Sequence, residues 1–411
     1  MKHVLLESER CWNRRSFLAA GAGGVLARAA SPPAKTVAAI VTEYRYYSHA
    51  DVIVGRILEG YSPNNQRVEP RTRIVSMYTD QIAPKDMSRD LAAKHGFRIF
   101  PTVAEALTLG SGKLAVDAVL LVGEHGDYPT NEKGQKLYPR FELFQRIIDV
   151  YKRSGRVAPL FCDKHLSYSW DKARMMYRQA REMRIPFMAG SSIPVTVRMP
   201  ELELPLDSRL DHAVAVGYGG LDAYGFHTLE TLQCMVERRA GGEKGVAAVE
   251  TLEGDAVWKW RDGQDGRWSG PLLEAALSRA AKATPGLPER NVKSPVVFLV
   301  EYRDGFRAAV YMLNGHVQNF LFAATLAGRS EPVSTNFGLR DGRPLPHFDG
   351  LVHSIEELFV TAKPVYPVER TLLTTGILAF ALESRQQRRR LATSELDIVY
   401  RAPRNCYFQR A

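Results

Sequence analysis

The feature that most constrains this chain is a regular alternation of short apolar runs and amphipathic segments over residues 35–195. TVAAIV (36–41), RIVSMYT (73–79) and AVDAVLLVG (115–123) have the length and composition of buried strands. The segments between them, such as the one that ends at Gly155, have the hydrophobic period of helices. This alternation predicts an α/β domain, with a doubly wound parallel sheet and helices on both faces. VAPLFCDK and IPFMAGSS are expected to be further strands of the same sheet.

The pattern changes after about residue 200. HTLETLQCMVERRAGG is predicted to be a helix with a glycine stop, and FDGLVHSIEELFVTAK and TLLTTGILAFALESRQQ are predicted to be terminal helices. Longer strands are expected in GVAAVETLEGDAVWKWRDG and PVVFLVEYRDGFRAAVYML, with hairpin turns at Asp262-Gly263 and Asp304-Gly305. The sequence therefore predicts a Rossmann-like domain over 35–195 and an α+β domain with a mostly antiparallel open sheet over 196–411.

Residues 1–30 have the pattern of an export signal. Arg14 and Arg15 precede a weakly apolar run rich in Ala and Gly, and Ala27-Arg28-Ala29 offers a cleavage site. The order NRRSFL is similar to twin-arginine signals. An amphipathic N-terminal helix is the alternative, which the glycines of the apolar run disfavour. We therefore expect export to the periplasm or the outside of the cell, by a pathway that carries folded proteins.

Composition and charge exclude several classes of protein. The chain has 55 Lys and Arg against 45 Asp and Glu, but the basic residues are scattered. The densest run, Arg385 to Arg390, follows an apolar helical segment, where basic residues complement the helix dipole. Because no zinc-finger or RNA-binding motif is present, no nucleic-acid partner is expected. Beyond residue 30 no run reaches the ~20 apolar residues of a membrane span. None of the four cysteines forms a C-x-x-C pair, and Cys162 and Cys234 are expected to be buried free thiols.

Several segments in serial order resemble the Gfo/Idh/MocA family, which includes glucose–fructose oxidoreductase and inositol dehydrogenase. SRDLAAKHGFRIFPTVAEAL followed by VDAVLLVG resembles the helix, loop and strand after that family's second β-strand. LFCDKHLSYSWDKARMMYRQAREMRIPFMAG is similar to the segment with the family's E-K-P motif, and GFHTLETLQCMV is similar to its histidine-bearing helix. The resemblance covers about residues 36–400. It implies a dinucleotide fold, a second domain with an open antiparallel sheet, and NAD or NADP as cofactor.

The turn after the first strand departs from the dinucleotide fingerprint. That fingerprint needs glycines, one of which lets the backbone approach the pyrophosphate, but residues 42–48 (TEYRYYS) contain none. Bulky side chains there would fill the space of the diphosphate, and Glu43 would repel it. Ser48, at the start of a helix, and Arg45 could still contact a phosphate. Asp80 matches the acidic residue that binds the ribose hydroxyls, or else it only forms a turn.

Asp163-Lys164-His165 stands where the family has E-K-P. The resemblance implies that Lys164 is the catalytic lysine, which approaches the nicotinamide and the substrate hydroxyl. His165 replaces the proline that shapes the turn. A lysine among other titratable groups can take part in acid–base chemistry. The alternative is a structural ion pair between Lys164 and Asp163 or another acid.

His227 aligns with the family's histidine that exchanges a proton with the substrate carbinol. An aspartate normally stands four residues earlier, where this chain has Ala223. We expect Asp222, or the phenol of Tyr224, to take the role of that aspartate. The alternative is that His227 is only a helix cap or a core group.

A dense group of polar residues, Glu124 to Pro129 (EHGDYP), follows the strand 115–123. Ligands of open parallel sheets bind at the carboxyl ends of strands, so this loop is expected to face the cleft. The resemblance implies that His125 corresponds to a histidine near the nicotinamide, and Glu124 is predicted to contact the cofactor. A divalent metal on Glu124, His125 and Asp127 is an alternative, but three adjacent ligands rarely converge, so no metal site is predicted. Tyr138 and Arg140 are further candidates for framing a sugar or a carboxylate.

Two functions agree with these residues. In the first, the chain is an exported oxidoreductase that moves a hydride between NAD or NADP and a sugar or cyclitol hydroxyl, with Lys164 and His227 handling the proton. In the second, the dinucleotide site has decayed, and the chain is a non-redox carbohydrate-active enzyme or a carbohydrate-binding protein. Both imply a carbohydrate-like small molecule as partner, and family analogy implies a homo-oligomer formed through an exposed sheet face. Both also require Lys164 and His227 to meet in one crevice beside residues 124–128.

Overall fold

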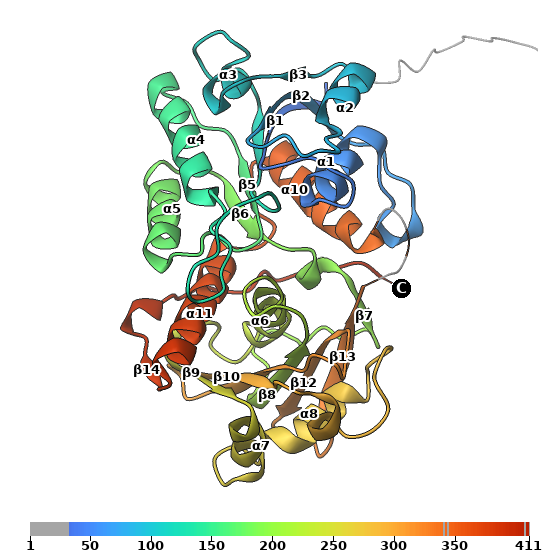
Figure 1. Cartoon of the computed structure of the whole chain (residues 1–411), viewed down its shortest axis with the longest axis vertical. Helices are drawn as coiled ribbons and strands as arrows, with labels where there is room; N and C mark the ends of the chain where they lie inside the picture. Colours follow the sequence, from blue (N-terminus) through green and yellow to red (C-terminus); the bar gives the residue numbers. More distant parts are fainter. Residues whose placement is uncertain (1–32, 340–341, 343–344, 407, 411) are drawn as a thin grey trace, which may run out of the picture. The chain divides into compact units, whose positions relative to one another are not determined.

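Six strands form a parallel sheet, as the alternation predicts (Figure 1). Its order is β3-β2-β1-β4-β5-β6, and every neighbouring pair is parallel. This is the strand order of the dinucleotide-binding fold, and its topological switch point lies between β1 and β4. The strands are β1 (Lys35–Val41), β2 (Thr72–Thr79), β3 (Arg98–Ile99), β4 (Ala118–Val122), β5 (Leu160–Asp163) and β6 (Phe187–Gly190).

Strand β1 shows why its segment lies in the middle of the sheet. Alternate residues from Val37 to Val41 pack on one face, and the residues between them pack on the other. A strand that is buried on both faces needs a continuous apolar run rather than an alternating one. Ser48 begins the next helix as predicted, because its side chain accepts a hydrogen bond from the Asp51 amide. The helices of this part are α1 (His49–Glu59), α2 (Ser88–His95), α3 (Val103–Thr108), α4 (Arg140–Ser154) and α5 (Trp170–Glu182).

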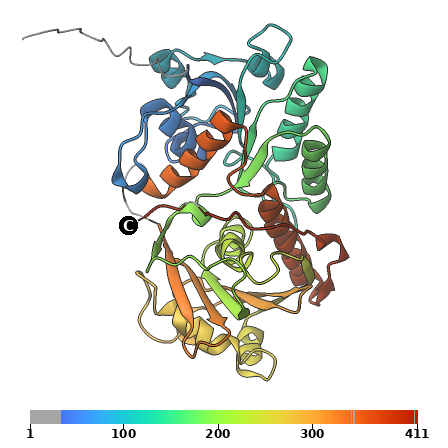
Figure 2. The same cartoon turned by 180° about the vertical axis from the view of Figure 1, so that it is seen from behind.

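Helix α10 (Asp349–Thr361) returns from the C-terminal part of the chain to the first sheet. It packs against α1, in the apolar cluster that covers one face of β1, and both views place the two helices side by side (Figures 1 and 2). This helix was predicted from its sequence as a terminal helix of the second domain. Its apolar side chains cover the first sheet instead, so the chain crosses between the two sheets more than once.

Eight strands form the second sheet, in the order β14-β9-β10-β11-β8-β12-β13-β7. Every neighbouring pair is antiparallel except β8 and β11, which confirms a mostly antiparallel sheet. The hairpin turn at Asp304-Gly305 is confirmed between β10 and β11. The strands are β7 (Val197–Met199), β8 (Leu210–Gly217), β9 (Val246–Glu253), β10 (Val296–Tyr302), β11 (Arg307–Met312), β12 (Phe320–Leu326), β13 (Val333–Gly338) and β14 (Leu391–Ala392).

The predicted hairpin at Asp262-Gly263 is wrong. Only the first half of GVAAVETLEGDAVWKWRDG is a strand, and DAVWKWRD forms helix α7 (Asp255–Asp262), which Gly263 ends. Gly254 separates the two elements with a left-handed φ of 61°. That glycine lets the chain turn away from the sheet at the end of β9, and the tryptophans of α7 then pack against the sheet.

Both faces of the second sheet are covered. Helices α6 (Ala223–Val236) and α11 (Val368–Gln387) pack on one face, in an apolar cluster that is continuous with that of the first sheet. Helices α7 and α8 (Ser269–Leu277) pack on the other face. The expectation of a homo-oligomer was based on an exposed sheet face, and α7 and α8 cover the one that α6 and α11 leave free. A short helix, α9 (Pro288–Asn291), follows them.

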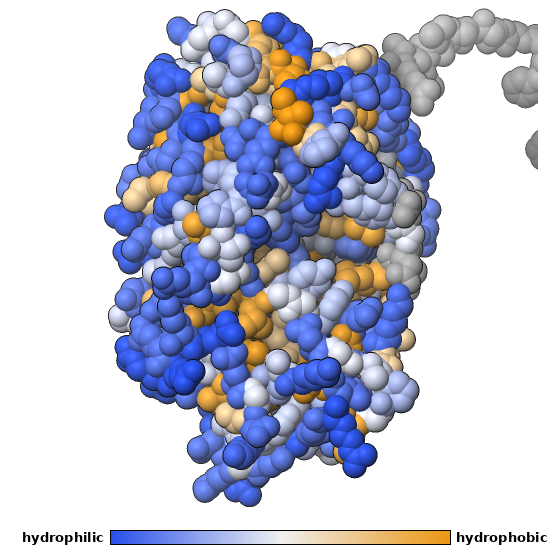
Figure 3. All heavy atoms as spheres, viewed as in Figure 1, coloured by the Kyte–Doolittle hydropathy of each residue, from blue (hydrophilic) through white to orange (hydrophobic). Residues whose placement is uncertain are grey.

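The structure is a computed structural model that describes residues 33–339, 342, 345–406 and 408–410. The export signal predicted for residues 1–30 lies outside this range. Within it, no helix is long and apolar enough to cross a membrane. The face in Figure 3 is mostly hydrophilic, with apolar side chains in small separate patches. Cys162 and Cys234 are buried free thiols, as expected.

Candidate functional site

The candidate site lies at the carboxyl ends of β1, β4 and β5, where open parallel sheets bind ligands. Glu124 follows β4, Lys164 follows β5, and His49 begins the helix after β1. These three elements are neighbours in the sheet, so their ends bring the three side chains together. The loop after β4 thus lies at the carboxyl edge of the sheet, where the sequence analysis expected it.

Glu124 is the centre of the site and joins two cations. Lys164 Nζ donates to its Oε1 at 2.7 Å, and the guanidinium of Arg140 donates to its other oxygen. All three side chains are at least 93% buried, with exposures of 7%, 5% and 0% for Glu124, Lys164 and Arg140. Burial opposes the negative charge, but the attraction of Lys164 and Arg140 outweighs it and holds the pKa of Glu124 well below its usual range. The site therefore contains a carboxylate and two buried cations.

Two backbone features build this centre. At Gly123 a Cβ atom would lie 2.5 Å from Arg140 Cγ, so the glycine lets the arginine pass beneath the strand end. His125 and Lys164 both have left-handed backbones, with φ of 71° and 62°. Non-glycine residues in this region are strained by about 1 kcal/mol or more, and such strain is concentrated at functional sites. The turns after β4 and β5 thus each contain a non-glycine residue with a strained, left-handed backbone.

His227, on α6, faces this centre from the second sheet. Burial and the nearby charges of Lys164 and His49 lower its pKa well below 6.5, so the imidazole is neutral near pH 7. Its Nδ1 lies 2.9 Å from Ser191 Oγ. Ser191 directly follows Gly190, which forms a β-bridge with Lys164, so His227 and Lys164 lie at neighbouring strand ends. Their roles in a reaction remain predictions.

The partner of His227 differs from the two expected residues. No hydrogen bond joins it to Asp222 or Tyr224 in the described part of the chain, and the ring of Tyr224 stands edge-on at 5.9 Å. Ser191 takes this place, and its own hydroxyl donates to a carboxylate oxygen of Glu230. When Glu230 is ionised the Ser191 proton goes to Glu230, so Nδ1 of His227 carries a proton and Nε2 holds the lone pair. Burial raises the pKa of Glu230 to about 7.

Asp222 instead lies next to the residue that replaces the family's proline. Its carboxylate is 3.8 Å from His165 Nε2, and it accepts a hydrogen bond from the Lys136 amide. Burial raises the pKa of Asp222. His165 is itself buried, and burial together with Arg140 lowers its pKa well below 6.5. Asp222 therefore belongs to the wall of the site and does not orient His227.

His49 and Asp163 form a pair that the sequence did not indicate. His49 Nδ1 lies 2.6 Å from Asp163 Oδ2, and the His49 amide donates to His125 Nδ1 at 3.2 Å. Burial and the charge of His49 lower the pKa of His125 to about 4, so His125 is neutral at pH 7 and can accept that bond. His125 is thus held at the site, as predicted, but its accepting nitrogen is used inside the protein.

The residues at the start of α1 do not fit a dinucleotide bound in the manner of a glycine-rich loop. The amides that would face a diphosphate are already used: that of His49 donates to His125, and that of Asp51 donates to Ser48 Oγ. The Asp51 carboxylate also stands in this first turn, where it would repel phosphate. Ser48 is therefore a helix cap. Arg45 is committed to Glu43 at 2.6 Å and points partly to solvent.

Asp80 is also engaged by the chain itself. Its two carboxylate oxygens accept hydrogen bonds from the hydroxyls of Tyr78 and Tyr128, each at 2.7 Å. A ribose would have to displace both phenols. The predicted cofactor contacts of Arg45, Ser48 and Asp80 thus have partners within the protein.

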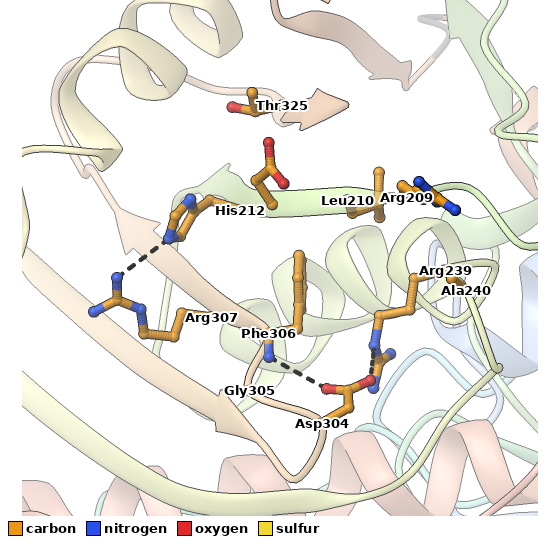
Figure 4. Close-up of a pocket in the computed structure, with 11 residues that line it drawn as sticks. Arg209, Leu210, His212, Arg239, Ala240, Asp304, Gly305, Phe306, Arg307 and Thr325 are labelled. Carbon is orange, nitrogen blue, oxygen red and sulfur yellow. Dashed lines mark hydrogen bonds and ion pairs between the residues drawn. The ribbon is translucent and has the colours of Figure 1, made fainter. Parts of the chain in front are cut away.

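A metal centre and a pocket on the second sheet are the two alternatives to this site. Among the residues that the structure describes, no three His, Cys, Asp or Glu side chains are arranged to hold a metal ion. A pocket of about 700 Å³ lies on the second sheet, between β8 and the turn before β11 (Figure 4). There Arg307 donates to His212 Nε2 at 3.3 Å and Arg239 donates to Asp304 at 2.7 Å.

The sequence identified only part of the site. Lys164, Glu124, His125 and His227 were predicted and are brought together, and Arg140 was a weaker candidate. The sequence analysis missed three residues of the site: His49 at the start of a helix, Ser191 at the end of a strand and Glu230 inside a helix. None of them belongs to a motif with a recognisable residue spacing. One signal was available for His49, since it lies directly after the predicted cap Ser48, in the connection that follows β1.

The two sheets define the fold: an α/β domain of dinucleotide-binding topology followed by a mostly antiparallel α+β part. Solved structures share this fold. GenD2 from gentamicin A biosynthesis, in complex with NAD, is 13% identical with a TM-score of 0.55 and covers 87% of this chain and 96% of its own. The scyllo-inositol dehydrogenase of Lactobacillus casei, with NAD(H) and scyllo-inositol, is 10% identical with a TM-score of 0.53 and covers 88% and 99%.

A third structure is an oxidoreductase from Agrobacterium radiobacter in complex with NAD+, L-tartaric acid and magnesium. It is 12% identical, with a TM-score of 0.52, and covers 88% of this chain and 99% of its own. At such identities the likeness establishes the fold. No family model matches the sequence, and no curated protein matches it.

Proposed function

We propose that this chain belongs to the Gfo/Idh/MocA family and acts on a sugar- or cyclitol-like molecule by acid–base chemistry, without a dinucleotide held in the glycine-loop manner. The observation that carries the proposal is the cluster at Glu124. Lys164 and His227, far apart in the sequence, lie at the same carboxyl edge of the sheet, whereas the amide of His49 in the first turn of α1 is bonded to a protein group. A site with one neutral base and one fixed cation can move a proton at an oxygen-bearing carbon.

Each residue of the cluster has a separate task in this proposal. His227 presents the lone pair of Nε2 and accepts the proton. Ser191 and Glu230 hold its ring in that tautomer. Lys164 donates a hydrogen bond to the substrate oxygen that gains negative charge, and Glu124 positions the ammonium group. Arg140 keeps Glu124 ionised.

Nucleotide analysis and ligand binding test this proposal. Purified protein is denatured, and the released small molecules are analysed for NAD(H) and NADP(H); we expect none. Thermal unfolding is then measured with myo-inositol, D-glucose and D-glucuronate, and with NAD+ or NADP+. We expect a sugar or cyclitol to raise the midpoint in the wild type and not in Lys164→Met, and neither nucleotide to raise it. Stoichiometric nucleotide, or no response to any polyol, would contradict the proposal.

A second function remains a candidate because of the fold. Three dehydrogenase-type structures that share it are named as complexes with NAD, and Lys164 stands where the resemblance implies the catalytic lysine. In this alternative the chain oxidises a sugar or cyclitol hydroxyl with NAD or NADP bound in another way. Polyol-dependent reduction of added NAD+ or NADP+, followed at 340 nm, would establish it.

We also propose that the protein is exported by the twin-arginine pathway, to the periplasm or beyond. The arginine pair Arg14-Arg15 and the small residues at Ala27 and Ala29 support this. A reporter fused behind residues 1–35 should leave the cytoplasm of a bacterial host. Replacement of both arginines by lysine should retain it inside.

A further inference from the structure

Two imidazoles in the site are anchored in the same way. His49 and His227 each use Nδ1 for a bond to a buried polar group, Asp163 at 2.6 Å and Ser191 at 2.9 Å. Neither Nε2 has a hydrogen-bond partner among the described residues. The two side chains are also equally accessible, with 13% and 12% of their surfaces exposed, although their anchors are buried. In each ring, Nε2 therefore points away from the residue that holds Nδ1.

Asp163 has the properties of a carboxylate that orients an acid–base histidine. Its side chain is wholly buried, and its Oδ1 has no hydrogen-bond partner within the described residues. A buried carboxylate that is satisfied on one oxygen only is costly, so Asp163 would lose much of its stabilisation without its bond to the His49 ring. As a carboxylate it can only accept, which places a proton on Nδ1 of His49. Such a carboxylate fixes the orientation of the ring.

The two imidazoles come from opposite sides of the site. His49 stands at the start of α1 on the first sheet, and His227 stands on α6 on the second. Lys164 and Glu124 belong to the same centre, because Asp163 directly precedes Lys164, whose ammonium group donates to Glu124. The two anchors are neighbours, since Asp163 pairs with Gly190 and Ser191 directly follows Gly190. Strained backbones at His125 and Lys164 flank His49, whose amide bonds the His125 ring. A small molecule that contacts Lys164 would thus meet an imidazole from each sheet.

We propose that His49 is a second catalytic acid–base group and that the site moves protons at a carbon next to a carbonyl, using His49 and His227 on the two sides of the substrate. The proposal rests on the proposed function and names its substrate class, a sugar or cyclitol that carries a ketone or aldehyde. His49 occupies the start of α1, where a glycine-loop protein would hold a diphosphate.

The step balances without any further reagent. One imidazole takes the proton as the C–H bond breaks, and the electron pair moves onto the carbonyl oxygen, giving an enolate that the Lys164 ammonium group stabilises. The second imidazole, which has taken a proton from solvent water, then returns a proton to the same carbon, and the first imidazole releases its proton to solvent water. A new C–H bond forms and the carbonyl is restored. Carbon is neither oxidised nor reduced, and the result is exchange or inversion at that carbon.

Deuterium exchange tests the proposal. Wild-type protein is incubated in D2O with 2-keto-myo-inositol, D-fructose or L-sorbose, and loss of the C–H signal beside the carbonyl is followed by proton NMR. We expect exchange with at least one ketone. General acid–base groups contribute about 10²–10⁴-fold, so His49→Asn and His227→Asn should each lower the rate at least 100-fold. The matched control is His95→Asn, which removes a surface imidazole bonded to Glu59 and should leave the rate unchanged.

A second measurement separates a catalytic His49 from a structural one. Nitrogen-15 NMR of histidine-labelled protein, assigned with the same variants, should show a proton on Nδ1 of both His49 and His227. Exchange in His49→Asn within threefold of the wild type, or a proton on Nε2 alone in His49, would overturn the proposal. A wild type that exchanges none of the three ketones also overturns it. If a polyol still stabilises that protein through Lys164, the proposed function survives; if it does not, both fail.

Discussion

Replacement of Glu124 by glutamine should destabilise the protein strongly. The change removes the one negative charge between Arg140 and Lys164, whose side chains are 0% and 5% exposed. Loss of one partner from a buried ion pair costs about 3–5 kcal/mol, because the remaining charge stays desolvated. The free energy of unfolding of a typical domain is about 5–15 kcal/mol, so the loss would be a large part of the total.

Urea unfolding at pH 7, followed by both circular dichroism and tryptophan fluorescence, measures this loss. The matched control is Glu69→Gln, which removes an exposed partner of Arg67 and should change the free energy of unfolding by no more than about 1 kcal/mol. The double variant Glu124→Gln, Lys164→Met should regain part of the loss, because it also removes one of the two unpaired cations.

The reasoning would be refuted by a Glu124→Gln variant that unfolds within 1 kcal/mol of the wild type. That result would mean that water reaches the cations, or that the glutamine amide replaces the carboxylate without cost. A double variant less stable than Glu124→Gln alone would also contradict it, because the interpretation requires the unpaired charge of Lys164 to be unfavourable.

Three further results are expected. Glu230 has a pKa of about 7 in the fold against an ordinary 4.5, so it binds its proton more tightly when folded, and its contribution to stability is lost as the pH rises from 4.5 to about 7. Glu230→Gln should therefore be more stable than the wild type at pH 8, by on the order of 3 kcal/mol, with no gain at pH 4; equal stability at pH 8 would contradict this. His125 should affect the pH dependence of stability in the opposite direction. Its pKa is lowered from 6.5 to about 4, so the free energy of unfolding should fall as the pH drops through this range. His125→Gln should flatten that acid limb of the urea midpoint, and an unchanged limb would show that other groups cause it. Burial raises the pKa of Cys162 and Cys234 to about 12, so a disulfide reagent at pH 8 should modify neither thiol until urea is added.

Local pattern was enough to predict most of the elements. The first sheet has continuous apolar strands because both its faces are buried, and glycines or caps such as Ser48 mark the helix ends. The segment after Gly254 shows the limit of this approach. DAVWKWRD has both the aromatic content of a strand and the spacing of a helix, and only its packing on the outer face of the second sheet selects the helix.

The site shows the same division. The sequence by itself determined which chemical groups end each strand, including Glu124 after β4 and Lys164 after β5, and it showed that the first turn lacks glycine. Only the tertiary structure decided how those groups are paired. It joined His227 to Ser191 rather than to Asp222, and it brought His49 to Asp163 from another strand end. The reason is physical, because a hydrogen bond depends on the distance between two side chains. Residue spacing fixes that distance within one helix or strand. Between two elements, the distance is set by how the sheets pack.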